Sequence, residues 1–140
     1  MNALSPECRA FLLKEPRTGK VATVRADGRP HVAPVWFDLD GDSIIFTTWH
    51  TTVKAVNMRR DGRICFCVDD ETPPYAYVQI EGTAVMSAES EALLYWATRI
   101  AGRYMGEELA EAYGKRNAVE GELLVRVTPT KVLFQKDIAD

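Results

Sequence analysis

The stretch FTTWHTTVKAVNMRR, residues 46–60, is the most informative part of the chain. It begins as a β-strand pattern, passes through a threonine-rich turn and ends as a short basic helix. The first amides of a helix lack intrahelical partners and lie at the positive end of the helix dipole, so this junction favours an anion. Thr48, Thr51 and Thr52 offer hydroxyl donors, and a bound anion would stabilise the first-turn cation Lys54. The junction predicts a phosphate site; the alternative is that the threonines serve as strand and cap residues and Lys54 is solvated.

Strand patterns surround this junction. Asp-Gly pairs predict hairpin turns at residues 26–30 and 38–42. Helical patterns cover Ser5 to about Lys14, the basic segment above, and residues 88 to about 118 with a break near 102–106. The seven predicted strands cover residues 20–25, 31–37, 43–48, 63–68, 75–87 with a bulge at Glu81-Gly82, 122–128 and 131–136, the last two separated by Pro129-Thr130. Hairpin-linked strands with few helices predict a mainly β fold with minor α: an antiparallel barrel with short flanking helices.

Composition limits the classes of partner. The chain has 140 residues, is 46% hydrophobic and 26% charged, and carries a formal net charge of −3. These values predict a single domain over residues 1–140 and no nucleic-acid partner, because the basic residues cluster only at Arg59, Arg60 and Arg63. No apolar run approaches the roughly 20 residues that span a bilayer, and the first residues lack a signal-peptide pattern. We therefore expect a cytoplasmic protein with no membrane partner.

The three cysteines do not suggest a disulfide framework, because their number is odd. Cys65 and Cys67 are spaced to lie on the same side of a strand. A zinc site would need wider spacing and additional ligands, so we expect structural cysteines and no metal.

The chain resembles the pyridoxamine 5'-phosphate oxidase-like split-barrel family in four segments: VATVRADGRPHVAPVWF (21–37), FTT (46–48), KAVNMRRD (54–61) and YVQIEGTA (77–84). Within this family it is most similar to the small actinobacterial flavin/deazaflavin oxidoreductases that use coenzyme F-420. The resemblance implies an antiparallel split β-barrel of the FMN-binding type. It also implies a homodimer with a flavin-like cofactor in each of two clefts between the subunits.

The resemblance further implies which residues contact the cofactor. The ring would lie along the strand His31 to Phe37, and the phosphate would lie at the strand-to-helix turn. Arg59 and Arg60 would lie near a charged cofactor tail; the alternative is that they remain solvated at the helix end. Tyr77 of the other subunit would pack against the ring; the alternative is that it packs in the core. The implied cofactor-binding residues are His31, Pro34, Val35, Trp36, Thr47, Thr48, Thr52, Lys54, Asn57, Arg59, Arg60 and Tyr77.

The sequence departs from the family pattern at the helix start. The oxidases that give the family its name carry an Arg-Lys pair there and a basic C-terminal motif, whereas this chain has Val53-Lys54 and ends in FQKDIAD (134–140). Without the guanidinium, a bidentate phosphate clamp is lost, which disfavours pyridoxamine phosphate oxidation. The phosphodiester of F-420 carries less charge than the terminal phosphate of FMN, so F-420 ranks above FMN as the expected cofactor.

The predicted function is hydride transfer between F-420 and a small conjugated organic acceptor. The alternatives are an FMN-dependent reductase or oxidase of the same fold, and a non-catalytic flavin or deazaflavin carrier. The sequence contains no recognisable Ser-His-Asp constellation, carboxylate dyad or metal cluster, so no catalytic residue is assigned. A proton could come from water, Tyr77 or His31.

Overall fold

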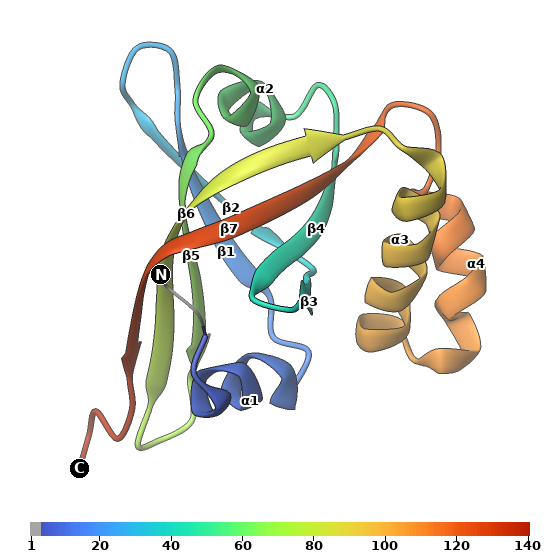
Figure 1. Ribbon diagram of the computed structural model, residues 1–140. Coiled ribbons are helices and arrows are strands. Elements are labelled where there is room, and N and C mark those ends of the chain that lie inside the picture. The colour runs from blue at the N-terminus through green and yellow to red at the C-terminus, as the bar shows by residue number, and fades with distance from the viewer. Residues whose placement is uncertain (1–3) are drawn as a thin grey trace.

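The seven strands form one antiparallel sheet in the computed structural model, which describes residues 4–140 (Figure 1). The sheet order is β2-β1-β5-β6-β7-β4-β3. In chain order the elements are α1 (Pro6–Lys14), β1 (Gly19–Val24), β2 (Pro30–Val35), β3 (Asp38–Asp40), β4 (Ser43–Trp49), α2 (Val53–Arg60), β5 (Arg63–Asp70), β6 (Ala76–Ser87), α3 (Ser90–Met105), α4 (Glu107–Asn117) and β7 (Glu122–Gln135). The predicted mainly β split barrel with short flanking helices is confirmed.

Residues 1–3, the start of the segment in which we expect no signal peptide, lie outside the described residues. Among residues 4–140, no helix has the length and hydrophobicity needed to cross a membrane.

The core is made chiefly of buried side chains from the strands of the sheet. Phe37 packs edge-on against Phe66 with ring centroids 5.1 Å apart, and Phe46 stacks over Phe66 at 6.3 Å. All three rings are fully buried. They come from the β2–β3 connection, β4 and β5, so burial of these rings holds together strands that are distant in the sequence.

Local capping signals define the helices. The Ser5 hydroxyl accepts a hydrogen bond from the amide of Cys8 at the start of α1, and the Thr52 hydroxyl accepts one from the amide of Ala55 at the start of α2. Gly106, at φ 94°, separates α3 from α4, as the expected break in the helical pattern indicated. Figure 1 shows α1 and α2 at opposite ends of the barrel and the α3–α4 pair beside β4 and β7.

Two strand predictions were wrong, although the number of strands is seven as expected. Residues 38–40 form the short strand β3 rather than part of a turn, and the last two predicted strands are one continuous strand, β7. The register shifts where Glu81 pairs with Lys131 and Gly82 with Pro129, which leaves Thr130 as an extra residue in β7. The predicted bulge at Glu81-Gly82 and the predicted break at Pro129-Thr130 are therefore opposite sides of one β-bulge.

Candidate functional site

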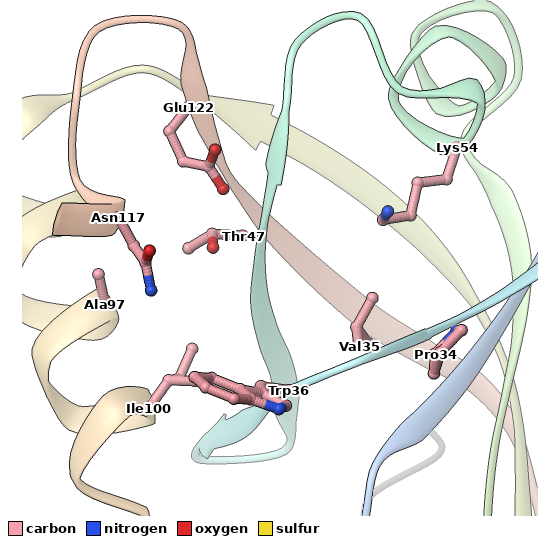
Figure 2. A pocket seen from close by; sticks show the side chains of 9 residues that line it. All are labelled: Pro34, Val35, Trp36, Thr47, Lys54, Ala97, Ile100, Asn117 and Glu122. Atoms are coloured by element: carbon pink, nitrogen blue, oxygen red, sulfur yellow. The ribbon is translucent and has the colours of Figure 1, made fainter. Parts of the chain in front are cut away.

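A cavity opens where the strand-to-helix junction meets the end of β2 and the α3–α4 pair. Its volume is about 250 Å³. Its lining side chains come from β2, the β2–β3 connection, β4, α2, α3, α4 and β7 (Figure 2). The lining residues are Pro34, Val35, Trp36, Thr47, Lys54, Ala97, Ile100, Asn117 and Glu122.

Lys54 supplies the cation of the cavity. It is the second residue of α2, after the Thr52 cap, and its side chain extends toward the cavity (Figure 2). Burial lowers the pKa of the Lys54 ammonium, while the charge of Glu122 acts in the opposite direction. The first turn of α2 contains no acidic residue, so no side chain within it neutralises the positive end of the helix dipole.

Glu122 places a carboxylate in the same cavity. It is the first residue of β7 and pairs with Trp49 at the end of β4. Burial raises the pKa of the Glu122 carboxyl, and the Thr47 hydroxyl and the Lys54 ammonium oppose this rise. The cavity therefore contains one cation and one acid, both partly removed from water.

Trp36 forms an aromatic wall. Its indole stacks on the Tyr104 ring with centroids 5.1 Å apart and planes 3° from parallel. The Tyr104 hydroxyl accepts a hydrogen bond from the amide of Phe37 at 3.1 Å and donates one to the carbonyl of Arg17 at 2.7 Å. The half-buried Trp36 ring is thus supported by a residue whose own position is fixed at both ends.

Five of the twelve predicted cofactor-binding residues meet in this cavity, namely Pro34, Val35, Trp36, Thr47 and Lys54. They bring together the strand expected to carry a ring and the junction expected to hold a phosphate. Their contact with a cofactor stays a prediction, because no ligand is present to test it.

Several other predicted residues have partners within the protein. The Thr48 hydroxyl lies 2.7 Å from that of Thr52, which caps α2. The buried Asn57 donates to the Thr23 hydroxyl at 2.9 Å and accepts a hydrogen bond from Arg60, whose guanidinium also donates to the carbonyl of Val24. These hydrogen bonds connect α2 to the end of β4 and to β1, so they hold the strand-to-helix junction in place.

The last three predicted residues do not line the cavity. Arg59 is exposed at the end of α2. His31 is half-buried on β2, and its Nδ1 atom has no hydrogen-bond partner among residues 4–140. Tyr77 lies near the start of β6, opposite Asp69 and Gln135. A cofactor contact from Tyr77 would therefore have to come from a second copy of the chain.

The sequence reasoning missed four lining residues: Ala97, Ile100, Asn117 and Glu122. Ala97 and Ile100 lie in the segment predicted to be helical, but no cofactor contact was predicted for them. Asn117 is the last residue of α4, within the helical pattern predicted to about residue 118, and its amide lies at the cavity. An acid at the head of the apolar run ELLV (122–125) was the one local signal for Glu122.

Comparisons with known proteins agree with this fold. The conserved hypothetical protein Rv2991 from Mycobacterium tuberculosis is 28% identical, with 97% of this chain and 87% of that chain covered and a TM-score of 0.82. A protein described as an F420 reductase is also 28% identical, with 92% and 98% covered and a TM-score of 0.72. The heme storage protein HutZ from Vibrio cholerae, 20% identical over 95% and 94% with a TM-score of 0.72, shares the fold.

A comparison with curated proteins finds no match. The family model described as Pyridoxamine 5'-phosphate oxidase matches residues 4–136, which is nearly the whole chain. The chain therefore belongs to the pyridoxamine 5'-phosphate oxidase-like split-barrel family.

Proposed function

We propose that the protein is an oxidoreductase that transfers a hydride between coenzyme F-420 and a small conjugated organic acceptor. The observation that carries this proposal is the convergence of the Lys54 ammonium, the Thr47 hydroxyl and the Trp36 wall on one cavity. An ammonium and a hydroxyl beside a helix N-terminus suit a phosphate, and an aromatic wall suits a flat ring. The family membership and the neighbouring F420 reductase support the same assignment.

The residues present fit a singly charged phosphate better than a doubly charged one. One ammonium faces one partly buried carboxyl, and no arginine lines the cavity among the described residues. The phosphate of F-420 is a diester with one negative charge, whereas a phosphomonoester such as FMN carries between about −1.5 and −2 at pH 7. This charge difference is the reason for placing F-420 above FMN.

The chemistry divides between the coenzyme and the chain. Bound F-420 would supply two-electron hydride transfer. The residues of this chain would bind the phosphate through Lys54 and Thr47, support the ring beside Trp36, and exclude water with Ala97 and Ile100. The acceptor would take up the hydride together with one proton from solvent.

We propose that the protein acts as a homodimer in the cytoplasm. A cavity of about 250 Å³ is below the roughly 300–1,000 Å³ of typical small-molecule sites, so one chain encloses only part of a tricyclic ligand. A second copy would complete the enclosure, and its Tyr77 could then reach the ring.

Titration of the purified protein with F-420 and with FMN tests the cofactor assignment, with ligand fluorescence as the signal. We expect F-420 to bind more tightly than FMN. Incubation of the reduced F-420 complex with quinone, enone and tetrapyrrole acceptors then tests turnover, because loss of the reduced coenzyme reports hydride transfer.

Each outcome distinguishes the alternatives. Tight FMN binding without F-420 binding would favour the FMN-dependent enzyme. F-420 binding with no hydride transfer to any acceptor would favour the carrier. Binding of haem in place of both ligands would align the protein with neighbours such as the heme storage protein, and would contradict the proposal.

A further inference from the structure

Glu122 occupies an unexpected position for a phosphate site. Its carboxyl enters the cavity that also receives Lys54 and Thr47 (Figure 2). The position is fixed by the pairing of Glu122 with Trp49, and the neighbouring hydrogen bond from the amide of His50 to the carbonyl of Gly121 holds the start of β7 against the end of β4. The backbone of Glu122 is therefore held in place, and its partly buried side chain lines the cavity.

The repulsion between a carboxylate and a bound phosphate depends on the charge of that phosphate. Coulomb repulsion rises in proportion to the ligand charge, and it is stronger in a partly desolvated cavity than in water. Lys54 offers a single positive charge, so an ionised Glu122 leaves the pair with no net charge. A dianion would meet about twice the repulsion from Glu122 that a monoanion meets.

We propose that Glu122 is a specificity-determining residue that disfavours a terminal phosphomonoester and so selects a ligand attached through a phosphodiester. This inference rests on the proposed function and names the ligand feature that the site selects, which is a phosphodiester. Lys54 and Thr47 bind the phosphate, and Glu122 limits the charge that they accept.

The electrostatic environment of Glu122 supports this role. Burial raises the pKa of its carboxyl, so the acid gains a proton more easily than a solvated glutamate. Once protonated, the carboxyl donates a hydrogen bond to a phosphate oxygen. Lys54 and the protonated carboxyl balance the charge of a monoanion, whereas a dianion beside them keeps one uncompensated negative charge.

The Glu122→Gln variant tests the inference with two ligands that differ only at the phosphate: FMN and its 5'-methyl phosphate ester. Dissociation constants are measured at pH 8 by quenching of flavin fluorescence, for wild type and variant. We expect the affinity for FMN to rise about tenfold and that for the ester about threefold, because the gain in log affinity follows the ligand charge.

Glu120→Gln is the matched control, since Glu120 is an exposed acid two residues before Glu122, in the α4–β7 connection, and does not line the cavity. This control should leave both affinities unchanged. Equal gains for the two flavins, or FMN binding no tighter in Glu122→Gln than in wild type, would overturn the inference.

A parallel titration of wild type with F-420 separates the two proposals. F-420 binding by wild type, combined with equal gains in affinity for FMN and its ester in Glu122→Gln, would contradict the role of Glu122 and leave the proposed function intact. Absence of F-420 binding by the wild-type protein would remove the proposed function, and the inference with it.

Discussion

Tyr104 links the aromatic wall of the cavity to the backbone on both sides. Its hydroxyl accepts from the amide of Phe37 and donates to the carbonyl of Arg17, while its ring stacks on Trp36. Burial raises the pKa of Tyr104, so the hydroxyl remains protonated and keeps its donor role. A single side chain therefore positions the surface against which we propose that the ring lies.

Removal of this hydroxyl should destabilise the protein. In Tyr104→Phe the amide of Phe37 and the carbonyl of Arg17 lose their partner, which costs about 1–3 kcal/mol in the free energy of unfolding. Urea denaturation measures this cost. Tyr95→Phe is the control, because Tyr95 is 55% exposed; equal stability of the two variants would show that the hydroxyl contributes nothing.

Glu122 should make the stability of the protein depend on pH. Its native pKa is raised above the usual value of 4.5, so the native state holds this proton more tightly than the unfolded state. Glu122 therefore lowers the free energy of unfolding as pH rises from 4.5 through the native pKa, and below 4.5 this effect vanishes.

Denaturation of wild type and Glu122→Gln at pH 4, 6 and 8 tests this sign. The variant lacks the titrating group, so its stability relative to wild type should increase with pH. A relative stability that stays constant or decreases over this range would show that the native pKa of Glu122 is not raised.

The bulge between β6 and β7 depends on Gly82. A Cβ at this position would lie 2.7 Å from the carbonyl oxygen of Thr128 and 2.7 Å from a methyl carbon of Val127, so the strands could not keep their present spacing. The extra residue Thr130 donates its hydroxyl to the carbonyl of Glu81 at 3.1 Å. Both strands therefore stabilise the bulge, β6 through the close approach at Gly82 and β7 through the hydrogen bond of Thr130.

Gly82→Ala should cost about 1–3 kcal/mol in the free energy of unfolding, because the backbone must shift to admit the methyl group. The loss of unfolded-chain entropy works in the other direction by only about 0.4–1 kcal/mol, so the clash prevails. Thr83 is the adjacent exposed residue. Thr83→Ala should therefore cost less than about 1 kcal/mol in the free energy of unfolding. A Gly82→Ala protein as stable as wild type in urea would contradict this description of the bulge.

The elements that the sequence predicted correctly are those whose signals come from residues close together in the chain. The Thr52 cap and the Gly106 break act within one helical turn, so their signals can be read locally. Pro129 misled the strand prediction because a proline usually ends a central strand, yet here it pairs within a bulge. β3, with three residues, is too short to show a period.

The family resemblance predicted Pro34, Val35 and Trp36 on the β2 side of the cavity, and the local sequence predicted the junction side. Lys54 and Thr47 follow from the strand-to-helix junction itself. Glu122 reaches them through the pairing of β4 with β7, and no pattern in a single sequence specifies that register. Asn117 depends in turn on how far α4 extends.

The proposed dimer predicts a particle of twice the 15.7 kDa chain mass. Light scattering coupled to size-exclusion chromatography measures this mass, and dilution below the dimer dissociation constant should weaken F-420 binding, because one chain encloses only part of the ligand. A monomer that binds F-420 as tightly at low as at high protein concentration would contradict the shared site.

The most direct test of the central claim compares F-420 binding by wild type, Lys54→Ala and the control Lys115→Ala. Lys115 is an exposed lysine on α4 whose ammonium pairs with Glu111, and it does not line the cavity. Loss of a charge-assisted bond to phosphate costs about 1–3 kcal/mol, so Lys54→Ala should raise the F-420 Kd by about 5- to 150-fold, while Lys115→Ala leaves it unchanged. An unchanged Kd for Lys54→Ala would contradict the claim that this junction holds the phosphate.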